Sequence, residues 1–182
     1  RDRAQRPAEL HGRVLRRLNS DAQDDQSPAF FPDGKSLVYS TEVEEQGSPL
    51  PYRRSLYRLD LAGGDASPLL AVTGAARDPV VSTDGAKVLF ALEVDGFQEA
   101  AELDLASGRV SRLTRSYGAC YTPVYTSSGA VAFAALRKGS VHIYAGPREG
   151  FLSEPVAPDR GISRGSVSGS FSDDLPFSPA AA

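Results

Sequence analysis

The sequence is poor in the residues that most often carry chemistry. Its 182 residues contain no tryptophan, no methionine, one cysteine and two histidines. A single cysteine excludes an internal disulfide bond. His11 and His142 lie far apart and have no cysteine or ligand-spaced carboxylate beside them, whereas a metal site needs several convergent ligands. No metal site and no cofactor site is therefore predicted.

Long apolar runs and a strong charge of one sign are also missing. No run is long enough to span a bilayer. The 20 basic and 23 acidic side chains give a net charge of −3, which argues against nucleic acid as the main partner. A hydrophobic content of 41% favours a packed protein over a disordered one. Cys120 is predicted to be a buried structural thiol, and the sequence leaves its redox state open.

What the sequence does contain is an internal repeat. Residues 27–43 return as residues 78–94 and, in a more divergent form, as residues 122–136. The prolines that begin the copies, Pro28, Pro79 and Pro123, are 51 and 44 residues apart, and each has a glycine six residues later. A period near 40–50 residues with strand-like units is typical of a β-propeller.

Each copy reads as four antiparallel strands. Apolar and polar residues alternate with period two, and Asp33-Gly34 and Asp84-Gly85 are strong tight-turn signals between two such runs. The sequence Leu-Asp-Leu-Ala before Gly64 recurs before Gly108 and predicts a turn into a fourth strand. Each proline is predicted at the start of the first strand, where a missing N–H costs little. A β-sandwich is the weaker alternative, since it does not require the same turn chemistry at a fixed period.

The repeat predicts an open arc that belongs to a larger propeller, and the absence of methionine also suggests a piece of a longer protein. We expect the chain to begin with a flexible basic arm. The alternative is an amphipathic helix, because Leu10, Val14 and Leu18 would share one of its faces. The expected divisions are a basic arm over 1–11, the last strand of a preceding blade over 12–20, blades over 26–75, 77–118 and 121–157, and a Gly/Ser-rich loop with the start of a further blade over 158–182.

The residues Phe30–Tyr39, followed by Ser55–Asp60, resemble the repeats of the TolB-type, WD40-like β-propeller family. The resemblance covers most of residues 12–157 and is strongest in the first copy. These motifs are turn and core residues, so they identify a fold and not an activity. Repeats of this kind without a paired nucleophile and base or a metal cluster predict a non-enzymatic protein-binding or scaffold module, part of a larger periplasmic or otherwise extracytoplasmic protein or assembly. The alternative is the gating, substrate-selecting propeller of a prolyl-oligopeptidase-like serine peptidase whose catalytic domain lies outside this chain.

Two patterns that mimic functional motifs are interpreted as ordinary loops. Gly161–Gly165 matches the Gly-x-Ser-x-Gly rule, but prolines precede it, a Gly/Ser-rich stretch follows it and no histidine lies downstream. Asp21, Asp24 and Asp25 break the spacing of a calcium loop and lack its closing glutamate. No catalytic residue is predicted.

The predicted partner-binding surface comes from a difference in length. From Gly34 to Leu59 is 25 residues, whereas from Gly85 to Leu103 is 18, so the first copy has a longer loop between its second and third strands. In the family this loop and the blade-to-blade loops share one face, where partners usually bind. Tyrosine and arginine are enriched in interface hot spots. The predicted binding residues are Tyr52, Arg53 and Arg54 on the long loop and Arg77, Tyr117 and Tyr121 on the blade-to-blade loops, with an ordinary solvated loop as the alternative.

Overall fold

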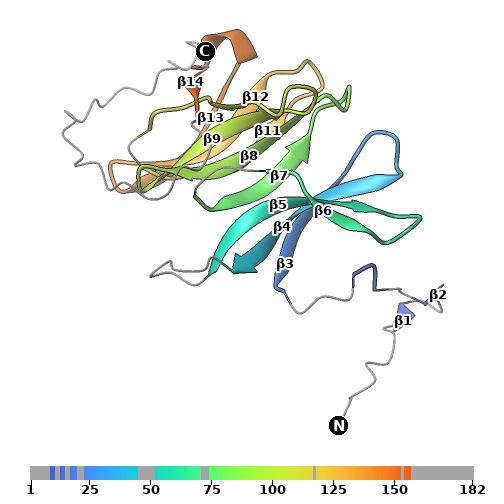
Figure 1. Cartoon of the computed structure of the whole chain (residues 1–182). Coiled ribbons are helices and arrows are strands. Elements are labelled where there is room, and N and C mark those ends of the chain that lie inside the picture. Colours follow the sequence, from blue (N-terminus) through green and yellow to red (C-terminus); the bar gives the residue numbers. More distant parts are fainter. Residues whose placement is uncertain are drawn as a thin grey trace.

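The predicted all-β class is confirmed by the computed structural model of the chain (Figure 1), which describes residues 9–10, 13–14, 17–19, 23–44, 52–70, 74–116, 118–152 and 154–156. The strands are β1 Glu9–Leu10, β2 Arg13–Val14, β3 Asp25–Phe30, β4 Ser36–Glu44, β5 Tyr52–Asp60, β6 Ala66–Pro68, β7 Ala76–Val81, β8 Lys87–Val94, β9 Phe97–Asp104, β10 Val110–Arg112, β11 Cys120–Tyr125, β12 Val131–Arg137, β13 Ser140–Gly146 and β14 Glu154–Pro155, with one short 3-10 helix, η1, at Arg148–Gly150.

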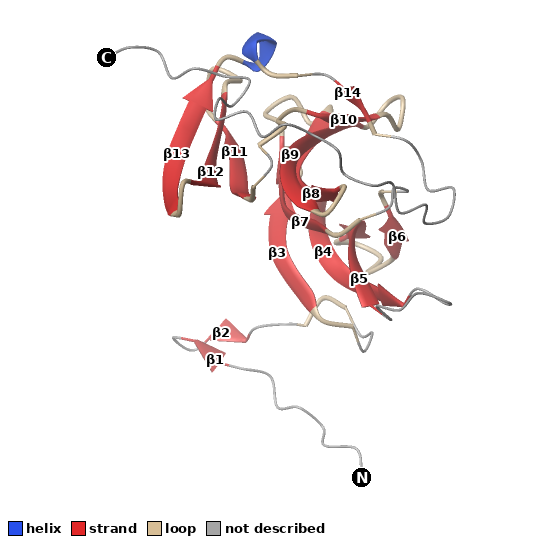
Figure 2. Ribbon diagram, turned by 90° about the vertical axis from the view of Figure 1, so that its left-hand side faces the viewer, coloured by secondary structure: helices blue, strands red, loops and turns tan. Residues whose placement is uncertain are grey.

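Each copy of the repeat forms its own antiparallel sheet. The first sheet has the order β3-β4-β5-β6, the second β14-β10-β9-β8-β7 and the third β11-β12-β13. The inner strands β3, β7 and β11 contact one another in that order, so the sheets succeed each other as blades do (Figure 2). In the described part of the chain, no helix has the length and apolarity needed to cross a membrane.

The turns form as their residues predict. Gly34 and Gly85 have φ of 65° and 72°, a region in which residues with a Cβ are disfavoured. The Asp84 carboxylate accepts the Ala86 N–H at 2.9 Å and so stabilises the turn before β8. Asp95-Gly96, between β8 and β9, has two positive φ values, 53° and 81°, as a two-residue hairpin requires.

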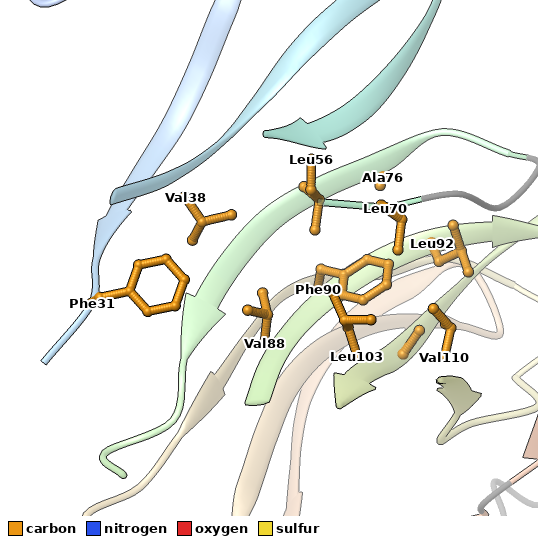
Figure 3. Close-up of a cluster of buried hydrophobic side chains, with 11 residues drawn as sticks. Phe31, Val38, Leu56, Leu70, Ala76, Val88, Phe90, Leu92, Leu103 and Val110 are labelled. Carbon is orange, nitrogen blue, oxygen red and sulfur yellow. The ribbon is translucent and has the colours of Figure 1, made fainter. Parts of the chain in front are cut away.

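Two apolar layers lie between successive sheets, and a third, smaller cluster of Leu37, Tyr39 and Leu59 lies on the opposite face of the first sheet. Val38 and Leu56 of the first sheet face Phe90 and Leu103 of the second (Figure 3). The second layer joins the opposite face of the second sheet to the third sheet and is made by Leu89, Ala100, Leu113, Cys120, Val131, Phe133, Ala135 and Phe151. Both faces of the second sheet are therefore buried, as expected for a sheet inside a stack of blades.

The third copy departs from the expected four strands. Its sheet has three described strands, and Glu154–Pro155, which fall within the predicted blade 121–157, pair instead with Ser111 and Arg112 of β10. The buried Phe151 explains this course, because its ring packs at 5.9 Å from Phe133 in the second core layer. The chain after β13 is thereby held against the second sheet, and the Leu152 N–H donates to the Leu113 carbonyl at 3.0 Å.

The N-terminal strands also differ from a regular blade. In the described part of the chain, Arg13 and Val14 pair with Leu10 and Glu9 in a two-stranded hairpin, so these residues are strands and not the alternative helix. The Gly161–Gly165 motif, the remainder of 158–182 and residues 1–8 lie outside the described residues. Cys120 is buried, and desolvation raises the pKa of its thiol.

Candidate functional site

The inner strands share one irregularity, a β-bulge that contains the repeat proline. In each pairing two residues of the inner strand oppose a single residue of the next strand. The opposed residues are Ser27-Pro28 against Tyr39, Asp78-Pro79 against Phe90, and Thr122-Pro123 against Phe133. Each proline is thus the fourth residue of its strand and not the first, which corrects the prediction. A bulge tolerates proline because its extra residue donates no ladder hydrogen bond.

The residues before these prolines, Ser27, Asp78 and Thr122, are called the inner-strand row below. Their φ values are 52°, 51° and 44°, in the left-handed region. Such values are uncommon for residues other than glycine, and a β-branched threonine there is an outlier. Backbone strain of this kind persists only where the surrounding structure holds it, and it gathers at sites that bind or react. The same strain in three successive copies marks the row as a candidate site.

Asp78 connects the row across three sheets. Ser27 Oγ donates to Asp78 Oδ1 at 2.9 Å, and the Thr122 N–H donates to Asp78 Oδ2 over a longer 3.4 Å. The carboxylate therefore bridges inner strands that belong to different copies of the repeat. Asp78 is half-buried, so this negative charge stays accessible to solvent at the surface of the inner strands.

The residues that directly precede the row form its rim, namely Gln26, Arg77 and Tyr121. All three side chains are exposed, Tyr121 at 38%. The structure thus places two of the predicted binding residues, Arg77 and Tyr121, at equivalent positions of neighbouring inner strands. They lie in β7 and β11 and not in the blade-to-blade loops, because these strands begin one residue before them.

The other predicted residues are placed differently. Tyr52, Arg53 and Arg54 belong to β5 and not to a loop, since β4 and β5 remain paired up to Glu44 and Tyr52. The segment between these strands, residues 45–51, and Tyr117 lie outside the described residues.

Arg54 is buried, with 5% of its surface exposed. Its Nη2 lies 2.9 Å from Asp24 Oδ2 and 3.3 Å from Glu42 Oε1, and its Nη1 donates to the Asp24 carbonyl. The prediction that Arg54 projects from a loop is wrong, because its guanidinium is buried against two carboxylates, Asp24 just before β3 and Glu42 of β4. Asp24, interpreted from the sequence as part of a solvated loop, is one of these partners.

Two buried carboxylates between the second and third sheets were not predicted. Glu99 is 1% exposed and accepts the Ser116 N–H at 2.8 Å and the Thr114 hydroxyl at 2.5 Å. It thereby fixes the chain that connects β10 to β11. Half of the residues of β9 are polar, so no local pattern of the sequence singles out Glu99 as buried.

Glu102 is the second buried carboxylate, and it joins separate elements. It lies 3.0 Å from Lys87 Nζ, 3.1 Å from Arg148 Nη2 and 3.0 Å from the Tyr125 hydroxyl. Burial opposes ionisation of Glu102, but the hydrogen bonds from Arg148 and Lys87 outweigh it and lower its pKa. Burial and the neighbouring Glu102 charge raise the pKa of Tyr125, so its phenol stays protonated and donates.

These networks are suited to holding sheets together and not to reaction chemistry. The Cys120 thiol lies 3.6 Å from Thr114 Oγ1, and its raised pKa makes it a poor nucleophile. His142 is an exposed residue of β13. Among the described residues, no group of three or more His, Cys, Asp or Glu side chains is placed to hold a metal ion. The inner-strand row and its rim form the candidate recognition surface.

Comparison with solved structures identifies the fold. TolB from Acinetobacter baumannii is 30% identical, with a TM-score of 0.56, over 70% of this chain and 31% of that one. An oligogalacturonate lyase solved with manganese is 16% identical, with a TM-score of 0.57, over 78% of this chain and 39% of that one. The β-propeller domain of the Trilobed protease from Pyrococcus furiosus is 12% identical, with a TM-score of 0.55, over 74% of this chain and 42% of that one.

The aligned region therefore spans less than half of each of these propeller structures. No protein-family model matches the chain, and no curated protein matches it.

Proposed function

The chain is built from TolB-type β-propeller repeats, and from this premise we propose that it is a non-enzymatic protein-binding module whose partner docks on the inner-strand row and its rim. Propellers host many unrelated functions, so the proposal depends on the site and not on the fold. We place the module in a larger extracytoplasmic assembly, as its similarity to TolB suggests.

The observation that carries the proposal is the pairing of Arg77 and Tyr121 on the rim. They are exposed at equivalent positions of adjacent inner strands, and each directly precedes a residue of the inner-strand row in the sequence. Arginine and tyrosine dominate interface hot spots because each combines a large contact area with hydrogen bonding.

The test is affinity capture from an envelope extract of the native organism, with the full chain as bait. Arg77→Ala and Tyr121→Ala are each expected to weaken partner recovery about thirtyfold, which corresponds to a hot-spot loss of about 2 kcal/mol. Arg109→Ala is the matched control, since Arg109 is equally an exposed arginine but lies in the turn before β10, away from the rim.

A third variant tests whether the partner binds the segment between β4 and β5 and not the rim. Replacing residues 45–51 by Asp-Gly would join Glu44 to Tyr52 as Asp95-Gly96 joins Val94 to Phe97. This change keeps the sheet and removes the long loop, so a loss confined to this variant moves the binding surface to the loop. Equal recovery of the same partners by every variant rejects the rim. Hydrolysis of peptide or ester substrates by the chain, abolished by Ser163→Ala, rejects the non-enzymatic role.

A second candidate function is favoured by the similarity to the propeller domain of a protease. In that case the chain would act as the gating propeller of a serine peptidase and select substrates for a catalytic domain outside this sequence. The complete gene distinguishes the two candidates. An α/β-hydrolase domain beside the repeats supports the peptidase, and a secretion signal without such a domain supports the binding module.

A further inference from the structure

The chain that follows the third sheet returns to the second sheet and adds a strand to it. β14 pairs with the edge of β10 that faces away from β9, so the second sheet has the order β14-β10-β9-β8-β7 (Figure 2). The first sheet has the four corresponding strands and, among the described residues, no fifth. β14 is therefore an addition to the repeat, and the second sheet is a complete blade without it. The described residues from Arg148 to Val156 are called the strap below.

The first anchor of the strap is a charge. The Arg148 guanidinium donates to both carboxylate oxygens of Glu102 over 3.1 and 3.2 Å. The Glu102 side chain is only 6% exposed. By the register of the strand pairs, the equivalents of Glu102 are Arg58 in the first sheet and Ala145 in the third. Among these three positions, a carboxylate is present only on the sheet that receives the strap.

The second anchor is an aromatic ring. Phe151 is 7% exposed and lies in the core layer between the second and third sheets, where its ring meets that of Phe133 edge-on at 5.9 Å. The turn of η1, in which the Phe151 N–H donates to the Arg148 carbonyl, sets the spacing of the two anchors. The anchors therefore have the sequence Arg-x-x-Phe.

The rest of the strap is held through its backbone. The Leu152 N–H donates to the Leu113 carbonyl and the Val156 N–H to the Val110 carbonyl, each at 3.0 Å. Pro155, which is part of the pairing with β10, has no N–H to donate. Sheets bind extended peptides from other chains in the same way, with backbone hydrogen bonds along an edge and separate pockets for side chains. The strap thus contacts the two sheets as a peptide ligand would.

Glu102 keeps other partners when the strap is absent. Lys87 Nζ lies 3.0 Å from one carboxylate oxygen, and the Tyr125 hydroxyl donates to the other at 3.0 Å. A buried charge that loses all of its partners is strongly destabilising, but Glu102 without Arg148 is still paired. An arginine from another chain can therefore take the place of Arg148.

We propose that the junction of β10 with the third sheet is a docking site for an extended segment of a partner protein, in which an arginine stands three residues before a phenylalanine. The strap is the chain's own competitor for this site. The partner segment places its arginine on Glu102, its phenylalanine beside Phe133 and its backbone along β10. Because the strap belongs to the same chain, its effective concentration is on the order of millimolar, so a free segment competes poorly with it. The strap is thereby an autoinhibitory contact.

Binding of a free peptide to the full chain tests the site. The probe is a fluorescein-labelled, C-terminally amidated hexapeptide with the sequence of residues 147–152, and fluorescence anisotropy measures its binding. The variant Arg148→Ala with Phe151→Ala lacks both anchors, and the hexapeptide is expected to bind it at least about tenfold more tightly than it binds the wild-type chain. Adding Glu102→Gln to this variant should weaken binding by about tenfold. Adding Glu93→Gln, at an exposed glutamate of the same sheet, should not.

Changes in the peptide test the two anchors. Alanine in place of the arginine or of the phenylalanine should weaken binding to the variant by at least about tenfold. Alanine at the position of Glu149 is the matched control and should have no effect, because Glu149 is exposed. Arg77→Ala in the chain should also leave peptide binding unchanged, so the result does not depend on the rim.

Three results would overturn the proposal. The first is a folded double variant that does not bind the hexapeptide, and the second is equal affinity of the variant and the wild-type chain. The third is a wild-type dimer that the hexapeptide dissociates, because the occupant would then be the strap of a second copy. If circular dichroism shows that the double variant is unfolded, Arg148→Ala alone replaces it, and no gain in affinity over the wild-type chain rejects the proposal equally.

Discussion

At the scale of single residues, the left-handed backbone before each repeat proline is the feature that most constrains the sequence. A residue with a Cβ in this region costs roughly 1–2 kcal/mol relative to the right-handed region. The three copies carry serine, aspartate and threonine there, none of which is glycine. Ser27 and Asp78 gain a hydrogen bond in return, through the 2.9 Å contact between their side chains. Thr122 contributes only its backbone N–H to Asp78.

This difference predicts the effect of glycine at Thr122. Thr122→Gly is expected to raise the free energy of unfolding by up to about 1 kcal/mol, because it relieves the backbone strain and keeps the N–H donor. Ser67→Gly is the control, since Ser67 is an exposed strand residue outside the positive-φ region, and it should lower that free energy by about 0.5–1 kcal/mol. Urea denaturation measures both. A loss at Thr122 as large as that at Ser67 would show that the threonine side chain makes stabilising contacts.

At the scale of elements, buried charges join parts of the chain that the repeat alone would leave separate. Glu102 of β9 binds Lys87 of β8, Tyr125 of β11 and Arg148 of η1. Arg54 of β5 likewise forms ion pairs with Asp24, just before β3, and with Glu42 of β4. Removing one member of such a group leaves a buried charge without its partner, which costs more than the pair itself contributes.

Glu102 should therefore make stability depend on pH. Its pKa is lower in the folded chain than in the unfolded chain, so its contribution is present above the unfolded pKa of about 4.3 and is lost as the pH falls through the folded pKa. Glu102→Gln is expected to lower the free energy of unfolding by about 2 kcal/mol at pH 7. The gap to wild type should close under acid conditions, because the wild-type side chain is then neutral too. Urea titrations at a series of pH values measure it, and a gap independent of pH would contradict the assigned network.

The strands and turns could be predicted from the sequence because their signals are local. Alternation of period two predicted β4, β8 and β12, and Asp-Gly predicted the tight turns. The sequence prediction placed Arg54 in a loop because it assigned the whole extra length between Gly34 and Leu59 to the loop between the second and third strands. The cross-strand pair Glu42–Arg54, opposite charges directly facing each other, shows that part of the extra length is paired strand.

Other features depend on packing between distant segments, which no local pattern reports. The course of β14 is set by Phe151 in the core between two sheets, and Phe151 is not a repeat position. The bulges could have been predicted from the sequence, because a proline inside a paired strand is tolerated only at a bulge or an edge. That Arg77 and Tyr121 occupy equivalent positions could be predicted from the 44-residue spacing of the repeat. The hydrogen bond between Asp78 and Ser27 could be found only in the structure.

At the scale of the whole molecule, the chain is a linear stack in which each sheet is stabilised mainly by its neighbours. The second sheet packs on both sides, through Phe90 toward the first sheet and Leu89 toward the third, and both side chains are fully buried. Within the residues that the structure describes, the third sheet has one such interface. In repeat architectures stability is close to a sum of unit and interface terms, so the sheets should differ in local stability.

Native-state hydrogen exchange resolves this difference. Amides of β8 and β9 are expected to exchange slowest, through global unfolding only, because their sheet loses two interfaces when it opens. The amides of β13 that point away from β12 are expected to exchange fastest at low protein concentration, since their strand forms the open edge. Protection of β13 equal to that of β8 in the dilute chain would contradict the graded stack, because the outer strand would then be held by contacts within a single copy.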